Sequence, residues 1–318
     1  MISYCLSCGK PLKDNEKNYH QACLKRLINA VDEQDFDIPK LDELIKEQIE
    51  KGNTVPGVQK KLSATLQNSC TSRKKTISNH SMSYIIKFPS VELPYITEME
   101  NLVMNMAEVC RIKTVDHALY LTKDNQYIYL TKRIDKEDGK HYPMEDFCQL
   151  SQRLTEDKYK GSYESLGYIL DKYSSQPIAD KTELLYRILF CYITGNNDMH
   201  LKNFSLISKD NKNFKLSPAY DLLNVSLINP DDKEEMALTI NGKKKNIGRK
   251  DFIRLIEKYK ISEKVYNGLV KVLVSFQMKI EELIDHALIS EELKVAFKEQ
   301  INKRLQLLEQ RLDSTQQV

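Results

Sequence analysis

Residues 195–204 read GNNDMHLKNF, the most distinctive polar stretch of the chain. The preceding residues 184–193 are apolar on nearly every side, which predicts a buried helix that holds this stretch rigidly. Asp198 and Asn203 stand five residues apart, the spacing of an acid and a metal-binding amide in phosphoryl-transfer loops. The carboxylate can accept a hydroxyl proton, and the amide oxygen suits a hard divalent cation. The structural alternative is that an Asn-Asn-Asp cluster only ends a helix and makes a turn.

A second acidic residue follows in the string SPAYDLL at residues 217–223, where Asp221 lies eighteen residues after Asn203. A carboxylate in this position would be the second magnesium ligand of such a site. On its own the string is more typical of a turn or a helix N-cap. Its interpretation as a ligand therefore depends on the loop at 195–204.

The pattern around these motifs changes from strand to helix. The first half, residues 52–130, is strand-rich, with one helix near 98–110. Helical periodicity then dominates, at 144–152, 163–172, 181–194, 250–259 and from 263 onward. We predict an α+β chain with a two-lobed, protein-kinase-like fold, in which a small strand-rich N-lobe precedes a larger helical C-lobe.

Three units are expected along the chain. They are a Cys/His segment at 1–30, an N-lobe with a phosphate-binding loop at 31–142, and a helical C-lobe with the catalytic and metal-binding loops at 143–318.

Lys87 ends an apolar, strand-like run, YIIK, so its ammonium can reach the phosphates of a nucleotide. Two interpretations of Glu100 are open. It can pair with Lys87 from the following helix, or it can complete a capping box by reaching back to Thr97.

The N-terminal segment carries three cysteines and one histidine at short spacing: Cys5, Cys8, His20 and Cys23. Such a Cys₃His set is typical of a structural Zn²⁺ site. The alternative is that these residues are reduced and simply packed.

The net charge, the lengths of the apolar runs and the cysteine count argue against several classes of protein. A net charge of +3 over 318 residues gives no concentrated basic character, so we expect no direct nucleic-acid binding. The start of the chain has no signal-peptide pattern, and no apolar run is long enough for a membrane span, so a cytoplasmic protein is expected. Seven cysteines, an odd count, argue against a closed disulfide framework.

The string GNNDxHxKNF followed by LSPAYDLL resembles the catalytic core of the HipA-like kinases, and similar pieces extend over residues 52–248. The resemblance implies that Asp198 is the catalytic base and that Asn203 and Asp221 bind Mg²⁺. It also implies that His200 and Lys202 support the loop or the phosphates. Lys132 and Arg133 would lie at the adenine-binding hinge, where most contacts come from the backbone.

Residues 52–59, GNTVPGVQ, resemble the phosphate-binding loop of this family. The implied nucleotide contacts include Thr54, Gly57, Val58, Gln59 and Lys61. In relatives this loop carries a serine that is autophosphorylated, which silences the enzyme. Here Thr54 is the autophosphorylation candidate, while Pro56 occupies a second position that can be serine and cannot accept a phosphate.

The resemblance implies a serine/threonine protein kinase toxin of a bacterial toxin–antitoxin system. It would transfer the γ-phosphate of ATP, with Mg²⁺, to a protein such as an aminoacyl-tRNA synthetase and block translation. The chain looks like the short, HipT-like form, whose partners are a small HipS-like protein and a HipB-like DNA-binding antitoxin.

Two alternatives stay open. One is a kinase for lipid head groups or small metabolites, because distant phosphoinositide-kinase-like enzymes share the loop arrangement. The other is a catalytically degenerate binding module, which should lack one of four residues that this chain retains: Lys87, Asp198, Asn203 or Asp221.

Overall fold

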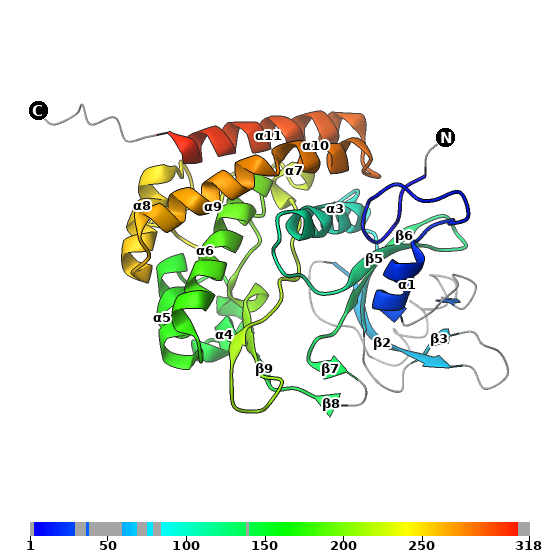
Figure 1. The fold of residues 1–318 in the computed structure, drawn as a ribbon, viewed down its shortest axis with the longest axis horizontal. Helices are drawn as coiled ribbons and strands as arrows, with labels where there is room; N and C mark the ends of the chain where they lie inside the picture. The colour runs from blue at the N-terminus through cyan, green and yellow to red at the C-terminus, as the bar shows by residue number, and fades with distance from the viewer. Residues whose placement is uncertain are drawn as a thin grey trace, which may run out of the picture.

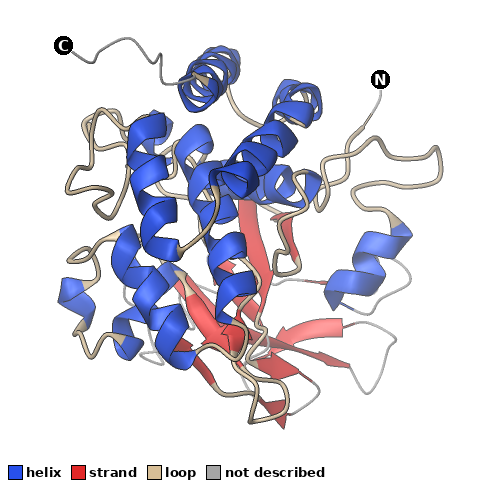
Figure 2. Ribbon diagram, turned by 60° about the vertical axis from the view of Figure 1, so that its left-hand side comes forward, coloured by secondary structure: helices blue, strands red, loops and turns tan. Residues whose placement is uncertain are grey.

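The computed structural model describes residues 3–28, 36–37, 59–68, 75–78, 84–137 and 140–310. A lobe built around a sheet precedes a larger helical lobe (Figure 1). Figure 2 separates the strands of the smaller lobe from the helices that gather above and beside them. The predicted α+β, two-lobed fold is confirmed, whereas the exact boundaries of the three units stay a prediction.

The N-lobe sheet has six strands in the order β1-β3-β2-β4-β6-β5. Only the β1–β3 pair is parallel. The β4 strand lies between β2 and β6, with Lys87 opposite Lys61 on one side and Tyr129 on the other. The strands are β1 (Phe36–Asp37), β2 (Lys61–Asn68), β3 (Lys75–Ser78), β4 (Tyr84–Lys87), β5 (His117–Leu121) and β6 (Tyr127–Lys132).

Within the described ranges, helices α1 (Gln21–Ile28) and α3 (Ile96–Val109) accompany this sheet. Helix α1 belongs to the N-terminal segment, and α3 packs on β5 and β6. The α3 helix is buried along most of its length because apolar side chains lie on several of its faces. The residue before it, Tyr95, is its N-cap, so Thr97 is not the cap that a capping box with Glu100 requires.

The C-lobe is built around α6 (Pro177–Thr194), the buried helix that the sequence predicts. Proline at its first position needs no hydrogen bond for its missing N–H, and Gly195 ends the helix in the left-handed conformation. The surrounding helices are α4 (Phe147–Leu150), α5 (Tyr163–Tyr173), α7 (Val225–Ile228), α8 (Arg249–Tyr259), α9 (Glu263–Ser275), α10 (Gln277–Asp285) and α11 (Glu291–Glu309), with the short 3₁₀ turns η2 (Thr155–Asp157) and η3 (Leu201–Asn203).

The prediction of one helix at 144–152 is wrong. Residues 144–146 form β9 (Met144–Asp146), and only 147–150 are helical. The reason is a long-range pairing, since β9 pairs with β10 (Ser205–Ile207), which also pairs with β11 (Lys215–Leu216). A separate hairpin joins β7 (Lys136–Glu137) and β8 (Lys140–His141).

Helix α11 lies beside the start of the loop at 195–204. Its apolar face, which includes Phe297, Ile301 and Leu305, is buried, and it packs on α6 and α9. Gln300 exchanges side-chain hydrogen bonds with Asn224 (2.9 Å) and Ser226 (3.0 Å), which border Gly195. The turn at Gly195 is therefore closely flanked by a helix about a hundred positions further along the chain.

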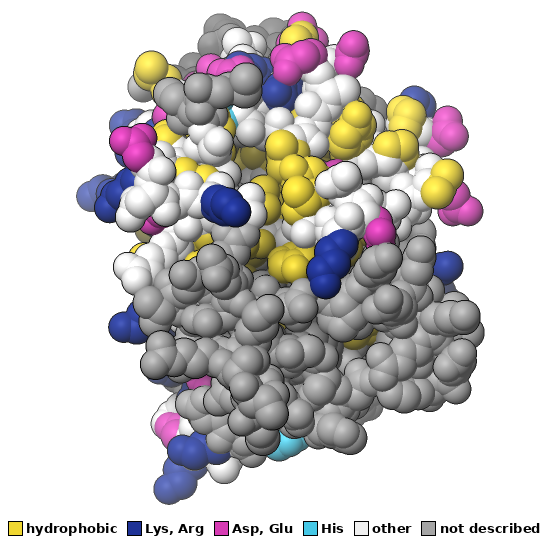
Figure 3. All heavy atoms as spheres, turned by 90° about the vertical axis from the view of Figure 1, so that its right-hand side faces the viewer, with side chains coloured by type: hydrophobic (Ala, Val, Ile, Leu, Met, Phe, Trp, Pro, Cys, Tyr) yellow, Lys and Arg dark blue, Asp and Glu magenta, His cyan; other side chains and the backbone are white. Residues whose placement is uncertain are grey.

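One face of the molecule carries many apolar side chains. On the side where the N-terminal segment lies, they gather across the upper half of the face, between scattered charged groups (Figure 3).

Among the helices of the described ranges, none combines the length and the apolar character needed to cross a bilayer.

Candidate functional site

A buried ion pair joins the two main elements of the N-lobe. The Lys87 ammonium, at the end of β4, donates to both carboxylate oxygens of Glu100 on α3, at 2.7 and 2.9 Å. The side chains are only 8% and 1% exposed. Of the two interpretations of Glu100, the structure contains the ion pair.

The same ammonium also donates to the carboxylate of Asp221, which comes from the C-lobe. Asp221 has a left-handed backbone (φ 59°), a conformation that Asp and Asn adopt more readily than other non-glycine residues. Lys87 thus contacts carboxylates of both lobes, although 134 residues separate it from Asp221.

The pKa values follow from this arrangement. Burial is the largest single effect on Asp221 and disfavours its ionisation, but the Lys87 and Lys61 ammonium groups together outweigh burial and lower the pKa to about 2. Burial dominates at Glu100 and raises its pKa to about 7, although Lys87 opposes the shift. Burial also disfavours a charged Lys87, yet Asp221 and Glu100 together raise its pKa and keep it protonated.

Asp198 lies in the same electrostatic region. Burial raises the pKa of its carboxyl group, and the negative charge of Asp221 raises it further. The hydroxyl of Tyr159 donates to the Asp198 carboxylate and opposes the increase. Because the charge of Asp221 contributes to the pKa shift of Asp198, these two carboxyl groups of the C-lobe lie within electrostatic range of each other. We call Lys87, Glu100, Asp198, Asn203 and Asp221 the interlobe site.

Local hydrogen bonds fix the loop that carries Asp198. The Asp198 N–H donates to the side-chain oxygen of Asn196 (3.2 Å), and the Asn203 amide donates to the Asp198 carbonyl (3.0 Å). Gly195, with φ 73°, begins the loop, and a Cβ there would lie 2.3 Å from Nε2 of Gln300. Only glycine fits both the conformation and the space.

His200 is buried beside this loop. Burial and the nearby Lys158 ammonium lower its pKa to about 4, so the ring is neutral at pH 7. Its edge packs against the ring of Tyr159, with centroids 5.0 Å apart, and its Nδ1 has no hydrogen-bond partner in the described part of the chain. The contacts of His200 among the described residues favour a role in packing against Tyr159. They do not favour a role in which a charged His200 ring binds a phosphate directly.

Lys202 lies at the C-lobe sheet. Its ammonium is 3.3 Å from Asp146, at the end of β9, and its carbonyl accepts from the Tyr220 hydroxyl at 3.1 Å. This residue therefore ties the loop at 195–204 to β9.

Lys132 and Arg133 lie at the end of β6, where the chain leaves the N-lobe. Lys132 is 3.9 Å from Asp116, and Nε of Arg133 donates to Asp135 at 2.9 Å. Both side chains thus contact acidic groups of the chain itself, which fits a hinge that offers its backbone to a ligand.

The predicted phosphate-loop residues are only partly described. Thr54, Gly57 and Val58 lie outside the described residues. The Gln59 amide donates to the Phe88 carbonyl (2.7 Å), directly after β4. The positive charge of Lys61 contributes to lowering the pKa of both Asp221 and Glu100. Gln59 and Lys61 are therefore part of the surroundings of the interlobe site.

The N-terminal residues also come together. One ligand atom each from Cys5, Cys8, His20 and Cys23 lies within 4.8 Å of all the others.

The donor set of the interlobe site fits a nucleotide with Mg²⁺. Asp221 supplies a carboxylate, and Asn203 has its amide NH₂ engaged, which leaves the side-chain oxygen for a cation. Both are hard oxygen ligands of the kind that Mg²⁺ prefers. The ammonium groups of Lys87 and Lys61 supply positive charge for phosphates.

Three polar residues of this region were not singled out from the sequence: Tyr159, Asn197 and Asp146. Tyr159 precedes Asp198 by 39 positions. The Asn197 amide donates to the carboxylate of Asp232 (3.0 Å) and to the Glu234 carbonyl. Tyr159 stands outside the motifs, and Asn197, although it lies within residues 195–204, contacts a residue 35 positions away, so spacing alone could not have found these contacts.

Known proteins resemble this chain over much of its length. The model of the HipA-like C-terminal domain family matches residues 53–282. A protein of Sinorhizobium fredii, "Putative kinase Y4dM", is 30% identical over 196 residues, covering 58% of this chain and 47% of the relative. A "Putative kinase" of Haemophilus influenzae is 28% identical over 246 residues, covering 71% of this chain and 69% of the relative. The chain thus spans about half the length of the first relative and about two thirds of the second.

Two solved structures have the same fold. HipA of Shewanella oneidensis, from a complex with HipB and its operator DNA, superposes with a TM-score of 0.69 at 19% identity, covering 83% of this chain and 70% of that one. The proinflammatory kinase CtkA of Helicobacter pylori gives a TM-score of 0.52 at 16% identity, covering 77% of this chain and 95% of that one. At these identities the likeness concerns the fold alone.

The family match covers well over half of the chain, including every described residue of the interlobe site. This protein belongs to the HipA-like kinase family.

Proposed function

We propose that this protein is an ATP- and Mg²⁺-dependent serine/threonine protein kinase that acts as the toxin of a bacterial toxin–antitoxin system in the cytoplasm. The observation that carries the proposal is the contact of Lys87 with Glu100 and Asp221, beside Asp198. It brings an ammonium for phosphates, a carboxylate for a cation and a candidate base into one region. Phosphoryl transfer needs these groups and little else from the protein.

Each residue has a stated role in this proposal. Asp198 accepts the proton of the acceptor hydroxyl, because its carboxyl group is buried in the loop at 195–204. Asn203 and Asp221 hold Mg²⁺, which neutralises charge on the transferred phosphoryl group when bound. Lys87 binds phosphate oxygens, and Glu100 keeps the ammonium in place.

The substrate class and the partners follow from the family. We propose an aminoacyl-tRNA synthetase as the protein substrate, with a HipS-like protein and a HipB-like DNA-binding antitoxin as partners. Support for an antitoxin comes from the related HipA, whose solved complex contains HipB and operator DNA. The similarity to the kinase named CtkA concerns the fold and supports no particular partner.

A labelling experiment tests the activity. Purified protein is incubated with γ-labelled ATP, Mg²⁺ and a bacterial lysate, and the label is followed in proteins, lipids and small molecules. One dominant labelled protein is expected, and Asp198→Asn should lower labelling by about 10²- to 10⁴-fold. The exposed Asp124→Asn, at the β5–β6 turn, is the matched control and should label normally.

Other outcomes contradict the proposal. Label confined to lipids or metabolites would identify a different kinase class. Label in nothing at all would indicate a binding module on a kinase scaffold. Expression of the wild type, but not of Asp198→Asn, should also slow bacterial growth.

We further propose that Thr54 is phosphorylated by the enzyme itself. After incubation with ATP and Mg²⁺, intact mass should increase by one phosphate, and phosphopeptide mapping should place it at Thr54. Thr54→Ala should abolish the increase. An unmodified Thr54 in active enzyme would overturn this part.

A further inference from the structure

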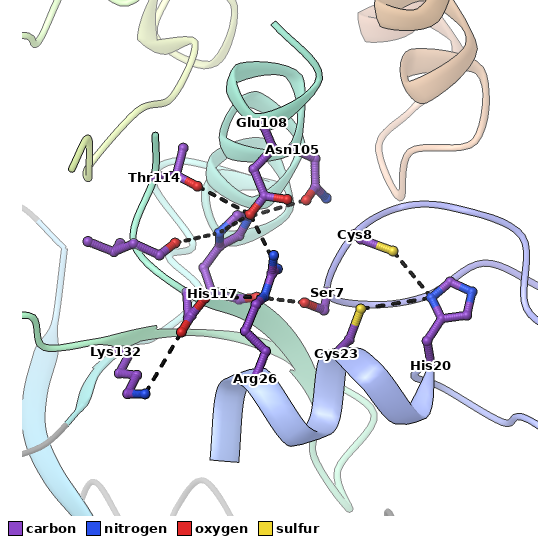
Figure 4. Close-up of polar contacts among 12 residues, drawn as sticks. Ser7, Cys8, His20, Cys23, Arg26, Asn105, Glu108, Thr114, His117 and Lys132 are labelled. Atoms are coloured by element: carbon purple, nitrogen blue, oxygen red, sulfur yellow. Dashed lines mark hydrogen bonds and ion pairs between the residues drawn. The ribbon is translucent and has the colours of Figure 1, made fainter. Parts of the chain in front are cut away.

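The N-terminal segment gathers four soft metal ligands in a small volume. Sγ of Cys8 lies 3.3 Å from Nδ1 of His20, and Sγ of Cys23 lies 3.9 Å from the same nitrogen (Figure 4). With Cys5, all four ligand atoms lie within 4.8 Å of one another. A tetrahedral zinc ion keeps thiolate and imidazole ligand atoms about 3.3–3.8 Å apart. The set is thus within about 1 Å of that spacing.

The second ring nitrogen of His20 is oriented by its surroundings. Nε2 lies 2.9 Å from the carbonyl of Pro11, to which it donates, and 3.8 Å from a carboxylate oxygen of Glu16. Two acceptors at Nε2 favour the tautomer with the proton there, which leaves Nδ1 unprotonated toward the sulfur atoms. Metal-binding histidines usually have such a partner behind the ring.

The backbone around the thiols also has the form of a metal knuckle. The Gly9 N–H donates to the Cys5 carbonyl (2.9 Å), and Gly9 has a left-handed conformation (φ 68°) directly after Cys8. The His20 N–H points to Sγ of Cys5 at 3.5 Å. Backbone donors of this kind stabilise a thiolate more than a neutral thiol.

The segment contacts the N-lobe beside the interlobe site. The Leu119 N–H on β5 donates to the Leu6 carbonyl, and the Ser7 hydroxyl donates to the His117 carbonyl, each at 2.9 Å. On α1, Arg26 reaches Glu108 of α3 at 3.3 Å. The segment therefore holds both β5 and the helix that carries Glu100.

The segment also contacts the C-lobe. The ring of Tyr4 stacks on His286 with centroids 4.0 Å apart, and its hydroxyl lies 3.1 Å from Nε2 of that histidine. His286 directly follows α10, which itself packs on α3. A cavity of about 350 Å³, lined by Asn101 and Asn105 of α3, lies between the segment and the end of α10.

We propose that Cys5, Cys8, His20 and Cys23 bind one structural zinc ion, which holds residues 3–28 as a brace between β5, α3 and the end of α10. Four protein ligands leave no open position, so the ion has no catalytic role. So short a segment has little core of its own, and metal binding supplies folding energy directly. The proposal does not depend on the proposed kinase activity.

Metal content provides the first test. The protein, purified without added metal or chelator, should contain one zinc per chain by elemental analysis and native mass spectrometry. Cys8→Ser and Cys23→Ser should lose the metal, whereas Cys148→Ser should retain it. Cys148 is the matched control, since it is a buried core cysteine whose thiol donates to the carbonyls of Arg153 and Leu154 and does not belong to the Cys/His cluster.

A spectroscopic test remains informative if the serine variants fail to fold. His20→Cys keeps four ligands and should still bind one ion. The Co²⁺-loaded wild type should show tetrahedral d–d bands with thiolate charge transfer, and His20→Cys should strengthen the charge-transfer band. Loss of binding in His20→Cys, or no tetrahedral spectrum in either protein, would overturn the site. Metal-free protein that carries a disulfide, detected as a mass lower by two hydrogens, would overturn it as well.

Hydrogen exchange tests the brace. Removal of zinc should speed amide exchange in α1, β5, α3 and α10, and leave α8 unchanged. Equal exchange in α3 and α10 with and without zinc would show that the ion serves only the local segment and would overturn the brace.

Discussion

The interlobe site and the N-terminal cluster bring polar groups together over very different distances in the chain. The cluster is complete within residues 5–23, and its spacing is visible as two short pairs. In the interlobe site, Lys87 contacts Asp221 from 134 positions away. The cluster depends on local turns, whereas the interlobe site depends on correct packing of both lobes. Each should therefore fail without directly changing the chemistry of the other.

Removing the shared ammonium should give the largest effect. Lys87→Met leaves the buried Glu100 and the half-buried Asp221 without their cation, which should lower the free energy of unfolding by about 3–5 kcal/mol. ATP-dependent labelling should fall to background. Urea unfolding and labelling measure the two effects, with the exposed Lys271→Met as control.

The zinc content of Lys87→Met tests whether the interlobe site and the N-terminal cluster are independent of each other. Lys87→Met that remains folded should retain the full zinc content of the wild type. Loss of zinc with an intact C-lobe would show that the two regions are not independent.

A crowded glycine should give the next largest effect. Gly195→Ala places a Cβ against Gln300 in a left-handed conformation, which should destabilise the protein by about 2–4 kcal/mol. Gly242→Ala is the matched control, because Gly242 is also left-handed (φ 76°) but has no atom within 4 Å of its added Cβ. Its cost should be only about 1–2 kcal/mol. Equal losses in the two variants would mean that crowding by α11 does not matter.

The pH dependence of the free energy of unfolding should distinguish Glu100, whose pKa is raised, from Asp221, whose pKa is lowered. Since burial raises the folded-state pKa of Glu100 from 4.5 to about 7, the stability linked to its proton is complete below pH 4.5 and is lost as pH rises through 7. Glu100→Gln should remove this slope. The measurement is the free energy of unfolding between pH 4.5 and 8, compared with the wild type. Parallel curves would contradict the assignment.

The smallest effect is expected from removing the Tyr159 hydroxyl, which donates a hydrogen bond to the candidate base, Asp198. Tyr159→Phe removes a hydrogen bond that holds down the pKa of Asp198, so that pKa should rise. Because a base must be deprotonated to act, the acidic limb of the pH profile of kcat/KM should move to higher pH. Activity well above that limb should fall by less than about tenfold. If the acidic limb of the kcat/KM profile did not move, Tyr159 would not be the residue that lowers the pKa of Asp198.

Apolar patterns that repeat every few residues predicted much of the secondary structure from the sequence. The buried helix before Gly195 and the helix with Glu100 both have apolar periodicity, and both are present. The strand at 144–146 was missed, because it exists only through pairing with residues 205–207. The choice between an ion pair and a capping box for Glu100 likewise depended on where β4 lies in the sheet.

The site itself was predictable to the extent that motif residues are close in sequence. Asp198 and Asn203 could be placed in one loop from their spacing alone. The left-handed turn at Asp221 and the contact of Tyr159 with Asp198 could not be predicted, since both follow from tertiary packing.

The dependence of the Gly195 turn on α11 sets an order of events during synthesis. Gln300 is translated 76 codons after Asn224 and 74 codons after Ser226, the two residues beside Gly195 that it hydrogen-bonds. A nascent chain still attached to its ribosome lacks this support, so its loop at 195–204 cannot reach the final packing until residues 291–309 emerge. The newborn molecule should therefore stay inert until residues 291–309 have been synthesised and can pack.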